Sequence, residues 1–116
     1  MMNREYKMYQ IYEKIGLDTD FYMYWFNDIG SWELPRVVKP CKAVLKENVE
    51  YKHPDFQYYV QMENGDTFTN PYLFMNICDS LENAITEYNK EVHEWEDAII
   101  KHANEINDIV NRYIVG

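Results

Sequence analysis

The fold is decided by residues 79–113, which read DSLENAITEYNKEVHEWEDAIIKHANEINDIVNRY. Large side chains recur there in steps of three and four, which gathers them on one face of an α-helix. The stretch contains neither Pro nor Gly, the residues that most disfavour a helix interior. It therefore predicts a single helix, about 50 Å long at a rise of 1.5 Å per residue. The stripe consists of Leu81, Ile85, Tyr88, Val92, Trp95, Ile99, His102, Ile106, Ile109 and Tyr113.

The beginning of this helix has two candidate N-caps. Asp79 is followed three residues later by Glu82, which is the spacing of a capping box. Ser80 also stands where the helix begins, and its hydroxyl can accept a backbone N–H. Either cap places the first helical turn next to residue 80.

The helix is longer than a small sheet can cover, so we expect it to contact something besides its own sheet. Beyond Trp95 the stripe is accompanied by Ala98 and Ala103, whose small size allows a second helix to approach closely. That helix is either residues 3–15 or the same helix of another copy. The second alternative predicts a structural homodimer, and its candidate seam is Trp95, Ile99, His102, Ile106, Ile109 and Tyr113.

Residues 3–15 predict a short N-terminal helix. Met8, Ile11, Tyr12 and Ile15 share one face of it. Gly16 stands at the position after the helix, where glycine commonly ends a helix in the left-handed conformation.

Residues 21–26, FYMYWF, predict a strand that is buried on both faces, because aromatic residues favour strands and a turn signal follows. The next apolar residues are interrupted by Pro35 and Pro40, which lack the N–H that a central strand needs. We therefore expect an extended connection over residues 31–40 and a strand over residues 41–45.

Residues 56–62 predict a strand, and Asn64-Gly65 predicts a hairpin after it. A two-residue turn would pair Gln61 with Phe68 and place Phe68 on the polar face. A three-residue loop over residues 63–65, with a left-handed glycine, pairs Val60 with Phe68 instead. We expect the second register because it keeps the apolar side chains together.

Residues 72–77 lead into the long helix, and we expect them to close one end of the core. The sequence thus predicts one α+β domain over residues 1–116. A short N-terminal helix precedes a small antiparallel sheet of three or four strands, and the long C-terminal helix packs on that sheet.

The net charge of −9 is concentrated in the second half of the chain. Residues 1–58 hold eight Lys or Arg and nine Asp or Glu, whereas residues 59–116 hold three and eleven. Direct nucleic-acid binding is therefore the least favoured function, since it depends on cations that neutralise phosphates. The basic segment 36–52, with Tyr51, Tyr58 and Tyr59 as stacking platforms, is what supports it. An acidic chain better fits a basic surface of a partner protein.

The best functional feature is the acidic side of the long helix. Glu87, Glu91 and Glu94 form a row at spacings of four and three, flanked by Glu96 and Asp97. Like charges at such spacings destabilise a helix by about 0.2–0.5 kcal/mol per pair. The row is either a solvated helix face or a patch that docks on a basic protein surface. The second interpretation predicts an inhibitor or regulator, and a nucleic-acid mimic where the partner surface handles nucleic acid.

No set of residues predicts catalysis, a cofactor or a metal. His93 and Asp97 are four residues apart without a third ligand, so we interpret them as a solvated His–Asp pair. Cys41 and Cys78 lie in no redox or metal spacing, which indicates free thiols in a reducing compartment. No apolar run is long enough to span a bilayer. These features predict a cytoplasmic, non-enzymatic protein.

The aromatic content is high, with 11 Tyr, 5 Phe and 3 Trp. Tyrosine serves equally in a core and on a recognition surface, and both interpretations apply to the run at residues 21–26. As a small, Tyr-rich, acidic chain without catalytic residues, the protein resembles many small phage-encoded proteins. The resemblance is one of composition and implies no role for any residue.

Overall fold

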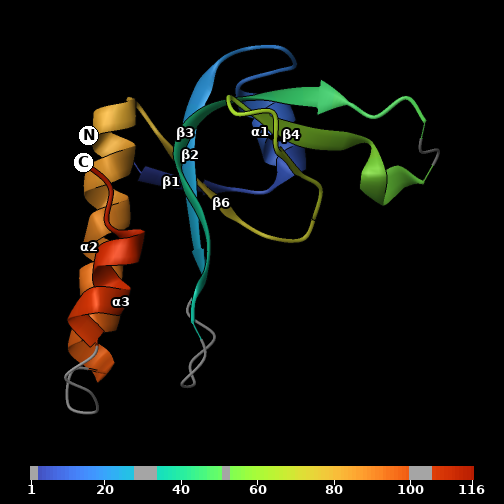
Figure 1. Cartoon of the computed structure of the whole chain (residues 1–116). Coiled ribbons are helices and arrows are strands. Elements are labelled where there is room, and N and C mark those ends of the chain that lie inside the picture. The colour runs from blue at the N-terminus through green and yellow to red at the C-terminus, as the bar shows by residue number, and fades with distance from the viewer. Residues whose placement is uncertain (1–2, 28–33, 51–52, 100–105) are drawn as a thin grey trace.

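The computed structural model describes residues 3–27, 34–50, 53–99 and 106–116, and it shows an α+β fold (Figure 1). Its six strands form one antiparallel sheet, larger than the three or four strands predicted, in the order β1-β6-β2-β3-β4-β5. The strands are β1 (Asn3–Tyr6), β2 (Phe21–Asn27), β3 (Arg36–Glu47), β4 (Tyr58–Met62), β5 (Thr67–Phe68) and β6 (Met75–Cys78). The helices are α1 (Met8–Lys14), α2 (Leu81–Ile99) and α3 (Ile106–Tyr113), with a 3-10 turn η1 (Pro54–Phe56) before β4.

Helices cover both faces of the sheet, with α1 on one side and α2 on the other (Figure 1). The side chains of β2 alternate between two cores. Phe21 and Met23 pack in the core that contains α1, and Tyr24 packs in the core beneath α2. Burial on both faces confirms the strand predicted for residues 21–26, and it explains why that strand lacks polar alternation.

Strand β3 is longer than predicted, and Pro40 lies inside it. The pairing of β2 with β3 shifts register between Met23 and Trp25, so Lys39 and Pro40 both stand opposite Tyr24. Such a β-bulge is one of the few places where proline enters a strand. Strand β4 pairs only with residues 43–47 of β3. Pro40 therefore interrupts no ladder on that side among the described residues. The expectation of an extended connection over residues 31–40 is wrong for residues 36–40, which belong to β3, and residues 31–33 lie outside the described residues.

The β4–β5 hairpin has the predicted register, with Val60 opposite Phe68. Gly65 has a φ of 92°, in the left-handed region that glycine adopts without steric cost. Its N–H donates to the Met62 carbonyl at 2.9 Å, and the Met62 N–H donates to the Asp66 carbonyl at 2.8 Å. The bulged three-residue loop is thus confirmed.

Two further strands replace elements that the sequence predicted differently. Residues 3–6 form β1 rather than the first turn of a helix, and α1 begins at Met8 after the Lys7 N–H donates to Gln10 Oε1 at 3.0 Å. Residues 75–78 form β6, a wholly buried strand between β1 and β2. Both corrections have the same cause, which is pairing between distant segments. Strand β6 pairs with β1 and β2, and the partners of Ile77 lie more than fifty residues earlier in the chain, so neither β1 nor β6 is visible in the local sequence.

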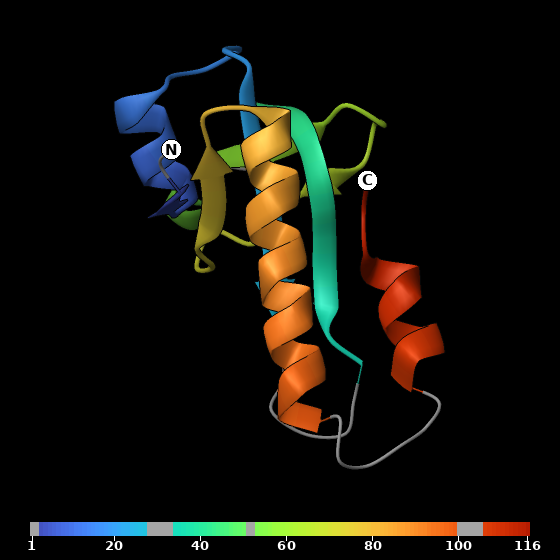
Figure 2. The same cartoon turned by 90° about the vertical axis from the view of Figure 1, so that its left-hand side faces the viewer.

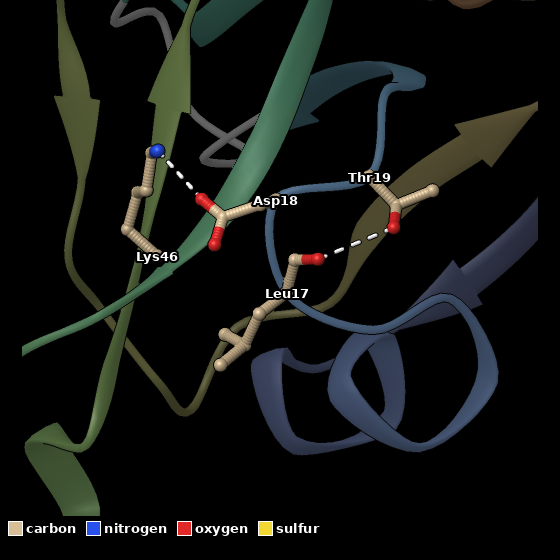
Figure 3. A network of polar contacts seen from close by, with 4 residues as sticks. All are labelled: Leu17, Asp18, Thr19 and Lys46. Atoms are coloured by element: carbon tan, nitrogen blue, oxygen red, sulfur yellow. Dashed lines mark hydrogen bonds and ion pairs between the residues drawn. The ribbon is translucent and has the colours of Figure 1, made fainter.

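Gly16 ends α1 as predicted, with a φ of 98° and its N–H donating to the Ile11 carbonyl at 3.0 Å. The following turn contains Asp18, whose φ of 57° is left-handed, a conformation that Asp tolerates better than most residues. The Asp18 N–H donates to the Leu45 carbonyl, and its carboxylate accepts a bond from Lys46 Nζ at 2.6 Å (Figure 3). These contacts fasten the turn between α1 and β2 to β3.

The N-cap of α2 is Ser80, whose Oγ accepts the Asn83 N–H at 3.1 Å. Asp79 instead lies 3.9 Å from Arg4 as an exposed ion pair. The prediction of a serine cap is confirmed, and that of an aspartate cap is wrong, because the Asp79 carboxylate faces the neighbouring strand β1.

Within the predicted helix, the described residues form two helices, α2 and α3, rather than one continuous helix along a single axis, and residues 100–105 lie outside the described residues. Helix α3 lies antiparallel beside α2 (Figure 2). The Asn89 side chain bonds the backbone N–H and carbonyl of Val115 at 3.0 and 2.6 Å, and the rings of Trp95 and Tyr113 meet edge to face at 6.0 Å. Because α3 packs back against α2, both Val110 and Trp95 are buried in one core. A single straight helix would carry Val110 beyond the sheet. The helix that packs beside α2 is therefore the C-terminal part of the same chain, not residues 3–15.

Candidate partner-binding site on α2

Three of the five predicted carboxylates lie along one flank of α2. At 3.6 residues per turn, Glu87, Glu91 and Glu94 follow one another on the flank toward β6 and β1. Glu87 and Glu91 are half-buried there, and Glu94 is exposed. Asp97 is exposed on the side of the helix away from the sheet. We call Glu87, Glu91 and Glu94 the acidic flank.

Glu96 does not belong to the acidic flank. It lies on the opposite flank of α2, seven residues after Asn89, which contacts the C-terminal tail. Glu96 Oε1 lies 3.2 Å from His93 Nδ1, and only 17% of the Glu96 side chain is exposed. The solvated His–Asp pair expected from the sequence is therefore a His–Glu pair, because residues three apart also meet on a helix.

A cavity of about 370 Å³ lies where the acidic flank meets the end of β2. Glu91, Glu94 and Trp95 line it from α2, and Phe26 and Asn27 line it from β2. We call this cavity the acidic recess. Trp95 is almost fully buried against Tyr113, so it contributes an apolar wall rather than an open ring face. Sequence reasoning missed the two β2 residues, because no local signal shows that β2 ends beside residues 91–95.

The charged form of Glu91 lies in an unfavourable electrostatic environment. Burial raises its pKa above the ordinary 4.5, and the charges of Glu94, Glu5 and Glu87 raise it further. A hydrogen bond from the Tyr24 hydroxyl lowers this pKa and offsets part of the rise. Glu91 Oε2 is itself buried, and no described group donates to it. The ionised carboxylate is thus held in the protein with only part of its hydrogen bonding satisfied.

The positive charges of β3 are engaged within the chain. Three lysines of the basic segment each contact an acceptor of another part of the chain, and the two that meet aspartates offer less net charge to phosphates. These contacts are Lys42 with Asp20 at 3.9 Å, Lys46 with Asp18 at 2.6 Å, and Lys39 Nζ with the Arg112 carbonyl at 3.2 Å.

The negative charges of α2 are not balanced in the same way. Over the described ranges of the chain, no Lys or Arg forms an ion pair with the acidic flank or with Asp97. Among the described residues, the acidic flank therefore has no cationic partner, whereas two lysines of β3 are paired with aspartates.

The predicted dimer seam is partly used inside the chain. Trp95 and Tyr113 contact each other, and both pack in the core beneath α2. The side chains of Ile99, Ile106 and Ile109 and the whole of His102 lie outside the described residues. Homodimerisation through this seam stays a prediction.

The two thiols are not activated. Burial raises the pKa of Cys41 to about 11, with a contribution from Glu63, and burial raises that of Cys78 to about 11 beside Glu87 and Asp79. Both are therefore protonated at neutral pH and are weak nucleophiles. Cys41 lines a second cavity of about 780 Å³ between β3 and the β4–β5 hairpin.

Where the chain is described, no three His, Cys, Asp or Glu side chains gather into a metal site. In the same residue ranges, no helix combines the length and the apolar character needed to cross a membrane.

Comparison of the chain with protein-family models, with curated proteins and with solved structures finds no match. Functional inference therefore rests on the site itself.

Proposed function

We propose that this is a small non-enzymatic binding protein that docks the acidic flank of α2 on a basic surface of a partner protein. By covering that surface it inhibits or regulates the partner. A row of carboxylates is also suited to a partner surface that otherwise holds nucleic acid, since the carboxylates and the phosphates of nucleic acid both present closely spaced negative charges.

The observation that carries this proposal is the contrast in charge pairing. Lysines of β3 contact acceptors of their own chain, whereas described Lys and Arg residues leave the acidic flank unpaired. Keeping Glu87, Glu91 and Glu94 within one or two helical turns of one another costs stability, because like charges at these spacings repel. A basic partner surface removes that repulsion, so complementary charge favours both fast association and correct orientation.

Affinity capture with a charge-reversal pair tests the proposal. Tagged wild-type protein, Glu94→Lys and Glu82→Lys are each incubated with nuclease-treated lysate of the native host, and retained proteins are identified by mass spectrometry. Glu94 is an exposed member of the acidic flank, and Glu82 is an exposed carboxylate of the first turn, on another side of the same helix. We expect a stoichiometric protein in the wild-type and Glu82→Lys samples that moderate salt releases and that Glu94→Lys fails to retain.

The same partner would then be measured by association kinetics at several salt concentrations. Glu94→Lys should slow association and flatten its salt dependence, because electrostatic steering acts mainly on the association rate. Equal retention by both variants, or association that is independent of salt, would contradict the proposal.

A further inference from the structure

The lining of the acidic recess indicates which chemical group of the basic partner surface fits there. It is an open hollow bordered by two elements, α2 and the end of β2, and its lining combines surfaces of three kinds. Glu91 and Glu94 provide carboxylates, Phe26 and Trp95 provide apolar surface, and Asn27 provides a side-chain amide. A solvated acidic surface would have the first kind alone. The combination fits a group that is cationic but also apolar over part of its surface.

The carboxylate at the inner side of the recess is incompletely satisfied. Tyr24 supplies one hydrogen bond to Glu91, while Glu91 Oε2 is buried and has no donor among the described groups. Because Glu91 Oε2 is buried, it is not itself a contact atom for a partner, and it instead adds incompletely compensated negative charge beside the recess. Glu94 follows three residues later, a separation at which side chains on a helix are neighbours. Exposed Glu94 can therefore contact a planar donor directly, and Glu91 adds its charge beside that contact.

We propose that the acidic recess receives the guanidinium group of an arginine side chain from the partner protein. The inference rests on the proposed function and specifies the residue that anchors the contact. The planar guanidinium presents N–H donors as a fork, so it bonds two carboxylate oxygens at once. It is also weakly hydrated, so it loses little on entering a site with apolar walls.

Lysine fits the same recess less well. Its ammonium is a compact, strongly hydrated point charge, and partial enclosure by Phe26 and Trp95 removes part of that hydration. An ammonium also lacks the planar fork that bonds both oxygens of one carboxylate, such as that of Glu94. The Asn27 side-chain oxygen can accept a further N–H from a guanidinium. The recess should therefore distinguish two side chains of equal charge.

Titration with two matched amino-acid amides tests this inference on the full-length protein. The probes are N-acetyl-arginine amide and N-acetyl-lysine amide, which carry the same charge, added at constant ionic strength and neutral pH. The indole N–H signal of Trp95 reports on the recess, and that of Trp25 is an internal control because its ring packs on Phe68. We expect a saturable shift of the Trp95 signal with the arginine probe and about tenfold weaker binding of the lysine probe.

Variants assign the effect to the recess. Glu91→Gln should weaken binding of the arginine probe about tenfold, and Glu82→Gln should leave it unchanged. Asn27→Ala gives an independent variant outside the helix, with a smaller loss expected. Equal affinity for the two probes, or unchanged binding by Glu91→Gln, would overturn the arginine assignment. If that happens while Glu94→Lys still loses the captured partner, the docking flank stands and only the recess assignment fails.

Discussion

Glu91→Gln is expected to stabilise the protein while it weakens partner binding. The substitution keeps the shape of the side chain and an oxygen for the Tyr24 hydroxyl, and it removes a charge that is repelled by Glu87 and Glu94. Two like-charge contacts on a helix cost about 0.4–1 kcal/mol together, and partial exposure of Glu91 screens them to ~0.5 kcal/mol. For a domain of this size, that gain corresponds to a rise in the melting temperature of about 2 °C at neutral pH.

The pH dependence of this gain identifies its cause. The folded protein holds the Glu91 proton more tightly than the unfolded chain does, because burial and the charges of Glu94, Glu5 and Glu87 outweigh the Tyr24 bond. Wild-type protein therefore loses this contribution to stability as the pH rises from below 4.5 through the raised pKa of Glu91. Glutamine does not titrate, so the advantage of the variant should be present at neutral pH and should vanish below pH 4.5.

Thermal unfolding followed by circular dichroism between pH 4 and pH 7.5 measures both effects. Glu82→Gln is the matched control, because Glu82 lies in the first turn of α2. That carboxylate interacts favourably with the helix dipole, so its loss should cost about 0.3–1 kcal/mol and lower the melting temperature. An unchanged or lower melting temperature for Glu91→Gln at neutral pH would refute the reasoning. A gain that persists unchanged at pH 4 would show that charge is not its source.

The remaining predictions concern the fold. Gly65→Ala should destabilise the protein by about 1–2 kcal/mol in chemical denaturation, because Gly65 has a φ of 92°, and an unchanged midpoint would argue against the bulged hairpin loop. Ser80→Ala should cost about 1 kcal/mol through loss of the α2 cap, and Asp79→Ala should cost less because its ion pair with Arg4 is exposed; equal losses would contradict the assignment of the cap. Light scattering at high micromolar concentration should give the mass of a monomer, since Trp95 and Tyr113 contact each other within the chain, and a dimer would instead support the predicted seam.

The parts of the fold that the sequence predicted correctly depend on local physical rules. The left-handed conformations at Gly16 and Gly65 follow from glycine's lack of a Cβ atom. The register of the β4–β5 hairpin follows from keeping Val60 and Phe68 on one face, and the cap of α2 from a serine hydroxyl at the helix start. Each of these depends on residues within about ten positions of one another.

The incorrect predictions of the strands all involve partners that are distant in the sequence, whereas the partner of His93 is a local exception. Strand β6 exists because β1 and β2 complete its hydrogen bonds on both sides, and nothing within residues 75–78 shows those partners. Pro40 is tolerated in β3 because a bulge against β2 accommodates it and β4 has already ended. These outcomes depend on which strands become neighbours, so local propensity could not decide them.

The candidate site divides in the same way. The sequence by itself determined the acidic flank, because the spacing of Glu87, Glu91 and Glu94 on any α-helix places them side by side. It also determined the apolar stripe that turns this helix toward the sheet as far as Trp95. Only the tertiary structure brought the C-terminal segment to the flank that carries Glu96, and brought Phe26 and Asn27 to Glu91. Helical periodicity is a property of the backbone, whereas the apolar lining of the recess and the buried, unsatisfied oxygen of Glu91 arise only where two distant segments meet.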